Sequence, residues 1–473
     1  MTLWRSSDAE RACGGVSTRA WAATGVSIDT RSLAAGDLFV ALTDRRDGHD
    51  FLAPAFEAGA AAGLVSHIPE TAPPELPLLV VPDVLQALER LGVAARRRMN
   101  GKIIAVTGSV GKTSTKEMLR LVLSRQGRTH AAEHSYNNHW GVPLTLARMP
   151  PDTEYAVIEI GMSHAGEIEP LSRLVRPDIG MITEIAPAHL AAFDSIAEIA
   201  EEKAAIFAGM DPGGCAVLNA DTEMFGILRA GAKRAQAHIV TFGGNASARF
   251  RLEEARMTEN GTVIRFSGDA GPQCAMLGTH GDHFARNAVG VFAAVSALEA
   301  DVTIASLDIR HWTPPPGRGA ESEIILDEEK PPLRLIDDAF NANPASLQAA
   351  LELLAARPAA GSDGTQRKIA ILGDMLELGS GEAVMHRDVA ALPAIGYLTK
   401  LHCAGALMRH LYDRLPSDRR GIWRATSDEL AAEVKRLVAP GDLILVKGSK
   451  SSRVSVIADA IRRLGIEAPE EVV

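Results

Sequence analysis

The residues best suited to chemistry lie in one short stretch, residues 107–114, which reads Thr-Gly-Ser-Val-Gly-Lys-Thr-Ser. An apolar run precedes it and a helical pattern follows, so backbone N–H groups are left unpaired at a helix N-terminus, where phosphate is favoured. Lys112 is placed to reach the β- and γ-phosphates of a nucleotide, and the Thr113 hydroxyl to reach Mg²⁺. The usual pattern has a further glycine where Val106 stands, so this is a shortened variant. The predicted nucleoside-triphosphate site comprises Gly108, Ser109, Val110, Gly111, Lys112, Thr113 and Ser114.

A carboxylate near the end of a buried strand is the second chemical feature. Residues 155–161 are apolar except for Tyr155 and Glu159. Ligands of open parallel sheets bind at the C-terminal ends of the strands. An acidic side chain in an apolar strand needs a partner, because burying an unpaired charge is costly. We therefore expect Glu159 to bind Mg²⁺.

Other polar residues are ambiguous from their types and positions alone. Asn137 and Asn138 form a polar cluster just before a predicted helix. His189 lies in a predicted loop, where a lone histidine is usually solvated. Lys203 lies among three glutamates in a predicted helix over 197–208, and a solvated charged face is the ordinary interpretation.

Three α/β units are predicted to position these residues. A small unit covers 1–100. A central unit with a parallel sheet and the phosphate loop covers 101–312, and short alternating strands over 246–278 predict a β-sheet flap on it. Three consecutive prolines then interrupt the chain, and a Rossmann-like alternation of strands and helices covers 313–473.

Composition narrows the functional class. The chain has 473 residues and is 46% hydrophobic, which suits several packed cores. Its net charge of −10 argues against a nucleic-acid partner. The four cysteines are widely spaced and predict neither a zinc site nor a disulfide framework. We see no signal peptide and no run near the ~20 apolar residues of a membrane span, so we expect a cytoplasmic protein.

Motifs along nearly the whole chain resemble the Mur ligase family. They lie at residues 29–32, 36–42, 107–114, 137–145, 157–161, 188–190, 202–207, 218–221, 316–318, 337–344, 373–379 and 446–449, in the order of that family. The Gly-Asp-Met-Leu-Glu-Leu-Gly loop at 373–379, and the absence of an Asp-Asn-Pro-Arg motif, resemble the members that add D-alanyl-D-alanine.

The resemblance implies an ATP-dependent amide ligase that joins D-alanyl-D-alanine to UDP-N-acetylmuramoyl-tripeptide through an acyl phosphate, a cytoplasmic step of peptidoglycan synthesis. It implies two Mg²⁺ sites, one at Thr113 and Glu159 and one at Glu159 and His189. It also implies that Lys203 is carbamylated and binds metal as a carboxylate would. Lys112, Glu159, His189 and Lys203 would then be the catalytic residues, and we expect a monomer.

The same resemblance assigns the substrates to three regions. The first unit would bind UDP, with Thr30 and Arg31 near the diphosphate, and Asn137 and Asn138 would help hold the substrate. Further ATP contacts would come from Asn287, Arg318, Asp338 and Asn341.

Three positions depart from the family pattern, and two other functions remain open. Phe284 and Glu184 each replace an asparagine, and Phe340 replaces a common tyrosine, which affects the expected adenine and metal contacts. A nucleotide-dependent binding protein without catalysis is one alternative. Another ATP-dependent amide ligase, acting on a UDP-muramoyl peptide or on folate, is the other. The sequence leaves open whether the tripeptide ends in diaminopimelate or lysine.

Overall fold

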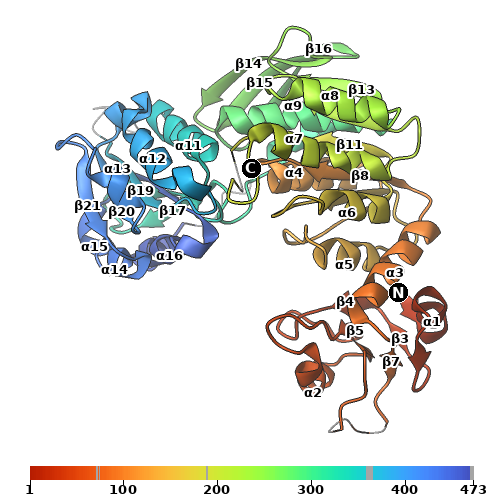
Figure 1. Ribbon diagram of the computed structural model, residues 1–473. Coiled ribbons are helices and arrows are strands. Elements are labelled where there is room, and N and C mark those ends of the chain that lie inside the picture. Colours follow the sequence, from red (N-terminus) through yellow and green to blue (C-terminus); the bar gives the residue numbers. More distant parts are fainter. Residues whose placement is uncertain (71–72, 74, 188–189, 358–365, 469–473) are drawn as a thin grey trace.

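The molecule consists of three α/β units, and the main β-sheet of each unit is formed by one continuous part of the chain (Figure 1). The computed structural model describes residues 1–70, 73, 75–187, 190–357 and 366–468. Within these ranges the sheets have five, nine and seven strands, and a small ribbon pairs β1 (Trp4–Arg5) with β3 (Ala22–Ala23). The α/β class with three units is confirmed, whereas the borders of the units stay predictions.

The N-terminal unit packs on the central unit mainly through one helix. Its sheet order is β2 (Val16–Ser17), β7 (Leu78–Val80), β6 (Ala62–Val65), β5 (Asp37–Val40) and β4 (Gly25–Ser27), parallel except at β2. Its helices are α1 (Ser6–Cys13), α2 (Leu52–Glu57) and α3 (Val84–Arg98). The buried face of α3 contacts α5 (Gly141–Ala147) of the central unit, and the Trp4 indole donates to the Ala147 carbonyl at 2.8 Å.

The central sheet places the phosphate-loop strand between two other parallel strands. Its parallel part runs in the order β9 (Thr129–Ala131), β10 (Tyr155–Glu159), β8 (Lys102–Thr107), β11 (Ile179–Ile182), β12 (Cys215–Asn219) and β13 (His238–Gly243). Because these strands are covered on both faces, β8, β10 and β11 are almost wholly buried and apolar. Their C-terminal ends meet at one edge, where the loops after β8 and β11 and the end of β10 lie together.

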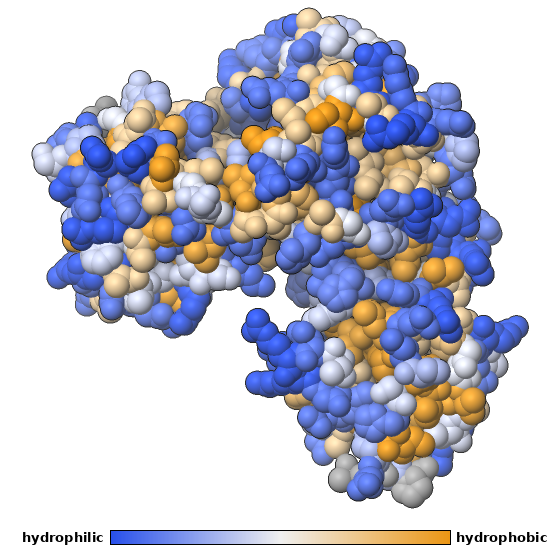
Figure 2. All heavy atoms as spheres, viewed as in Figure 1, coloured by the Kyte–Doolittle hydropathy of each residue, from blue (hydrophilic) through white to orange (hydrophobic). Residues whose placement is uncertain are grey.

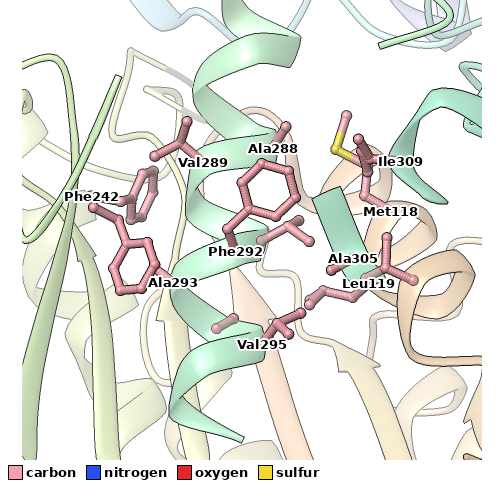
Figure 3. Close-up of a cluster of buried hydrophobic side chains, with 14 of the residues drawn as sticks. Met118, Leu119, Phe242, Ala288, Val289, Phe292, Ala293, Val295, Ala305 and Ile309 are labelled. Atoms are coloured by element: carbon pink, nitrogen blue, oxygen red, sulfur yellow. The ribbon is translucent and has the colours of Figure 1, made fainter. Parts of the chain in front are cut away.

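Helices cover both faces of the central sheet. One face carries α4 (Lys112–Ser124), α9 (Asp282–Ala297) and α10 (Val302–Asp308), and the other carries α5, α6 (Ile168–Val175), α7 (Ile196–Ala204) and α8 (Phe225–Arg234). Figure 3 shows the first core, in which Phe292 of α9 lies between Phe242 of β13 and Met118 and Leu119 of α4. This packing holds the helix behind the phosphate loop against the sheet.

The predicted β-sheet flap is instead the edge of the central sheet. β14 (Phe250–Thr258) pairs with the end of β13, and β15 (Gly261–Gly268) and β16 (Gly271–Leu277) follow as antiparallel neighbours. The inward side chains of these strands, including Phe250 and Phe266, are buried against α9. Their alternation reflects a sheet with one covered face, and that pattern does not tell which sheet the strands join.

The C-terminal unit has a parallel core with helices on both faces. Its order is β21 (Arg420–Arg424), β20 (Lys400–Ala404), β19 (Lys368–Gly373), β22 (Leu443–Lys447), β18 (Leu333–Asp338), β17 (Ala320–Ile325) and β23 (Ile466–Glu467), with β17 and β23 antiparallel to their neighbours. One face packs α11 (Pro344–Ala356), α12 (Glu382–Asp388) and α13 (Met408–Tyr412); the other packs α14 (Ser427–Ala431), α15 (Val434–Leu437) and α16 (Ser455–Arg462).

The outer units are both attached to the central unit and stand apart from each other. Figures 1 and 2 show open space between the N-terminal and C-terminal units on the side viewed. The linker 313–319, with its three prolines, joins the central and C-terminal units. Among the described residues, no helix combines the length and apolar character needed to cross a membrane.

Candidate active site

The loop after β8 is held by the end of β11. Gly108 has φ of 154°, and a Cβ there would lie 1.9 Å from the Thr183 hydroxyl oxygen, so a side chain does not fit. The Ser109 N–H donates to the Glu184 carbonyl at 2.7 Å, and the Thr183 hydroxyl donates to the Val110 carbonyl at 2.6 Å. The loop is therefore anchored before any ligand binds, and it leads directly into α4.

Lys112 lies over the loop at the first position of α4. Its Nζ donates to the Gly108 carbonyl at 2.6 Å. Burial lowers the pKa of Lys112 to about 8; the Glu159 carboxylate opposes this shift and the Arg318 charge adds to it. A polyanion in this position would favour the charged ammonium.

Glu159 is the centre of a cluster of oxygen-bearing side chains. The carboxylate is 2% exposed. It accepts hydrogen bonds from Thr113 Oγ1 at 2.9 Å, Ser135 Oγ at 2.8 Å and Asn137 Nδ2 at 2.7 Å. The predicted neighbours Thr113 and Glu159 are thus in direct contact, and Asn137 joins them.

This donor set fits Mg²⁺ when phosphate oxygens complete the shell. Carboxylate, hydroxyl and amide oxygens are hard ligands, and Mg²⁺ is usually held by one or two carboxylates together with waters and substrate phosphates. The described part of the chain holds no group of three or more His, Cys, Asp or Glu residues able to bind a metal by themselves. The cluster therefore suits a metal that arrives with a nucleotide.

A cavity of about 550 Å³ opens from the phosphate loop toward the C-terminal unit. It is within the size range of small-molecule sites. Predicted residues that line it are Ser109, Val110, Gly111, Lys112, Ser114, Asn137, Asn138, Glu159, Asn287, Arg318, Asp338 and Asn341. Residues predicted from widely separated parts of the sequence, between positions 109 and 341, therefore share one cavity.

The C-terminal side of the cavity carries a cation and a carboxylate. The Arg318 guanidinium lies 3.9 Å from the centre of the Phe340 ring, and burial lowers its pKa while Glu159 and Asp338 raise it. Lys447 is buried and donates to Asp338 at 2.7 Å and to the Asn341 carbonyl at 2.9 Å. Burial raises the pKa of Asp338, and the Lys447 ammonium opposes that shift.

Lys203 is buried, so the ordinary interpretation of its position as part of a solvated charged face is wrong. Its side chain is 1% exposed, and the described residues give its ammonium no hydrogen-bond or ion-pair partner. Burial lowers its pKa well below the usual value, and the charge of Lys112 lowers it further. The neighbouring Glu202 accepts instead from the backbone N–H groups of Gly166 and Ile168. His189 lies outside the described residues, so its predicted role stays a prediction.

Two of the remaining predicted substrate residues, Asn138 and Arg31, have local partners. The Asn138 side chain accepts from the Gly141 N–H at 2.9 Å, at the start of α5. Thr30 and Arg31 lie in the loop after β4 and do not line the cavity. Arg31 is exposed and pairs with Asp29 at 2.6 Å. The structure therefore does not bring these two residues to the phosphate loop.

Comparison with known proteins decides the family. The Mur ligase middle domain model matches residues 106–295, and the Mur ligase, glutamate ligase domain model matches residues 323–450. A Rickettsia prowazekii protein named UDP-N-acetylmuramoyl-tripeptide–D-alanyl-D-alanine ligase is 32% identical, over 97% of this chain and 99% of its own length. The chain belongs to the Mur ligase family.

Other relatives and solved structures agree with this Mur ligase assignment. An Escherichia coli protein of the same name is 32% identical over 93% of this chain and 94% of its own. A MurF crystal structure from Acinetobacter baumannii is similar with a TM-score of 0.82 and 27% identity, covering 97% of this chain and 98% of that one. A Thermotoga maritima MurF structure in complex with ADP shares the fold, with a TM-score of 0.75, 22% identity and coverage of 93% and 97%.

The three departures in this Mur ligase have clear structural surroundings. Phe284 is buried and packs edge-on against Trp312, with ring centroids 5.1 Å apart, at the base of the linker. Phe340 supplies the ring face under Arg318. Glu184 lines the cavity and accepts from Asn219 Nδ2 at 2.8 Å, and burial raises its pKa.

Sequence reasoning missed two residues that this Mur ligase uses to build the site. Ser135 completes the cluster around Glu159, and Lys447 holds Asp338 and the loop at Asn341. Lys447 is the last residue of the otherwise apolar strand β22, and a charged side chain at the end of an apolar strand is the same signal that identified Glu159. Ser135 has no comparable signal, because its role depends on a contact with a residue 24 positions away.

Proposed function

We propose that this Mur ligase joins D-alanyl-D-alanine to UDP-N-acetylmuramoyl-tripeptide, using ATP. The observation that carries the proposal is the single cavity lined by the phosphate loop, by Glu159 and by Arg318 and Asp338 of the next unit. The names of relatives that match almost the whole chain support the choice of substrates.

The chemistry explains why a phosphate site and an amide ligase belong together. A carboxylate is a poor electrophile because its leaving group would be an oxide. Transfer of the γ-phosphoryl group to the terminal carboxylate of the tripeptide gives an acyl phosphate and ADP. The free amine of D-alanyl-D-alanine then attacks the acyl carbon, and phosphate and a proton leave as the amide forms.

The side chains of the cavity have separate roles in this proposal. Lys112 turns from the Gly108 carbonyl to the transferring phosphoryl group and stabilises its charge. Arg318 meets the phosphates from the C-terminal side, and Asp338 and Asn341, fixed by Lys447, hold the nucleoside. Asn287 lies beside Gly111 and contacts the nucleotide from α9. Asn137 and Asn138 border the side where the acyl substrate enters.

Thr113 and Glu159 would hold Mg²⁺, with His189 and Lys203 completing a second site. Bound Mg²⁺ supplies positive charge that neutralises the phosphates during transfer. In the proposed nucleotide complex the Thr113 hydroxyl turns its lone pair outward and gives up its hydrogen bond to Glu159. Ser135 and Asn137 keep the carboxylate oriented.

A carbamate on Lys203 is the form we propose for that residue. A buried ammonium beside a metal site would repel the cation, whereas a lysine of lowered pKa is readily a neutral amine. That amine adds CO₂ and releases one proton, which leaves a carboxylate-like group suited to Mg²⁺. The absence of a partner for Lys203 among the described residues supports this form.

The N-terminal unit would bind the UDP moiety, with Thr30 and Arg31 near the diphosphate. Arg31 is exposed, and its guanidinium is positioned by Asp29 rather than used in a core contact. The linker 313–319 would act as the hinge when the outer units close on bound substrates. We propose that the enzyme works as a monomer in the cytoplasm.

An omission experiment tests the function. Phosphate release from ATP is measured with UDP-N-acetylmuramoyl-tripeptide and D-alanyl-D-alanine, and then with each one left out. We expect sustained release and a UDP-linked pentapeptide only in the complete mixture. Activity with a folate or with a single amino acid in place of the dipeptide would favour the rival ligases, and no turnover of any acceptor would favour a binding protein.

A further inference from the structure

Lys116 is a fully buried lysine on α4 for which the proposed reaction has no use. It is 0% exposed and lies one turn after Lys112 and three residues after Thr113. Burying an ammonium is unfavourable unless its hydrogen bonds are replaced. An apolar side chain at this helical position would pack in the core without that cost.

The ammonium is bound by the segment that follows β9. Lys116 Nζ donates to the Ala132 carbonyl at 2.5 Å and to the His134 carbonyl at 3.3 Å, and it pairs with Glu117 at 2.6 Å. β9 ends at Ala131, so these two carbonyls lie beyond the sheet. Lys116 therefore supplies, from the helix, hydrogen bonds to two carbonyls that lie beyond the paired strand.

This segment carries the side chains that orient Glu159. Ser135 follows His134 directly, and its hydroxyl donates to Glu159; Asn137 lies two residues further and donates to the same oxygen. The Asn137 carbonyl also accepts from the Gly161 N–H at 2.8 Å, which fixes the far end of the segment. Lys116 fixes the near end.

We infer that Lys116 is a positioning residue for the metal site, acting through residues 132–137; the inference rests on the proposed function. One helix then supplies the Thr113 hydroxyl and, one turn later, the ammonium that aligns the partners of Glu159. The distance between the phosphate loop and the carboxylate cluster is set by a single rigid element. Without the ammonium, Thr113 and Glu159 are still present. Ser135 and Asn137 are then no longer held in position to donate to Glu159.

The test replaces Lys116 with Met, which keeps the apolar length of the side chain and removes the charge. Arg120→Met is the matched control. Arg120 lies on the same helix and pairs with the same Glu117 at 2.7 Å, but it is half-exposed and has no bond to residues 132–134. The main readout needs no turnover: Mn²⁺ bound in the presence of a non-hydrolysable ATP analogue is measured by electron paramagnetic resonance. Hydrogen exchange of residues 132–138 and chemical unfolding are measured on the same samples.

We expect Mn²⁺ affinity to fall tenfold or more in Lys116→Met, and the hydrogen exchange of residues 132–138 to become faster. The affinity of this variant for the metal-free nucleotide should be unchanged. Arg120→Met should show little change in any of these quantities. Lys116→Arg, which keeps the charge, should recover part of the Mn²⁺ affinity. Parental Mn²⁺ affinity in a folded Lys116→Met protein would overturn the inference. If that variant does not fold, Lys116→Gln replaces it, and the same result would overturn the inference. A parent protein that binds nucleotide but no Mn²⁺ would overturn the metal site of the proposed function as well.

Discussion

Replacing Glu159 with Gln should separate the stability of the fold from the function of the site. The change keeps the shape of the side chain and removes one negative charge. The Gln oxygen can occupy the position of Oε1, where it accepts from Ser135 and Asn137 as before. The new NH₂ group then faces the Thr113 oxygen, which can accept from it instead of donating.

The hydrogen-bond count around residue 159 is therefore preserved, while the metal loses an anionic ligand. We expect the free energy of unfolding in the absence of nucleotide to change by no more than about 1–3 kcal/mol, because all three hydrogen bonds to residue 159 can be kept and only the Thr113 proton and the second amide N–H need new partners. The metal charge lowers a phosphoryl-transfer barrier by several kcal/mol. A loss of ~4 kcal/mol corresponds to a ~10³-fold lower rate.

Chemical denaturation of the ligand-free protein and phosphate release with saturating substrates measure the two quantities. Glu169→Gln is the control, because Glu169 is a half-exposed carboxylate on α6 that pairs with Arg173. It should leave both quantities nearly unchanged. Turnover of Glu159→Gln within tenfold of the parent would refute the assignment of Glu159 as a metal ligand. Unfolding weakened by several kcal/mol would refute the hydrogen-bond argument.

Three further predictions follow from the lysines and the linker. The pKa of Lys112 is about 8 without ligand and should rise when ATP binds. Binding of ATP at pH 8 should therefore take up about half a proton, and the affinity for ATP should fall as the pH rises further. Calorimetry in buffers of different ionisation enthalpy measures this uptake and would show none if the assignment is wrong. Lys203→Ala should lose at least ~10²-fold in rate and regain part of it with added short carboxylic acids, unlike the exposed control Lys233→Ala; near-parental rates without rescue would count against the carbamate. ATP with the UDP-substrate should compact the molecule about residues 313–319, and unchanged small-angle scattering would contradict that hinge.

The parts of the site that could be predicted from the sequence are those encoded by a few neighbouring residues. The phosphate loop is local, because two glycines, a lysine and a threonine in one turn define its chemistry. Glu159 was predictable because a carboxylate stands out in an apolar strand. The family resemblance added Arg318 and Asp338, and the structure places both in the same cavity as the loop.

The parts that could not be predicted depend on contacts between distant residues. Nothing in residues 196–204 indicates that Lys203 is buried, because glutamates surround it in the sequence and point elsewhere in the fold. The strands after residue 246 alternate as an independent flap would, and only the pairing of β14 with β13 shows that they extend the central sheet. Lys116 and Ser135 likewise acquire their roles from bonds that cross from α4 and β10 to one loop.

The most direct test of the proposed ligation follows one oxygen atom. UDP-N-acetylmuramoyl-tripeptide is labelled with ¹⁸O in both oxygens of its terminal carboxylate and is turned over with ATP and D-alanyl-D-alanine. The acyl-phosphate route predicts that one ¹⁸O atom appears in the released phosphate and that the other stays in the new amide of the pentapeptide. Unlabelled phosphate released together with that pentapeptide would contradict the route, and release of phosphate without the pentapeptide would contradict the ligase.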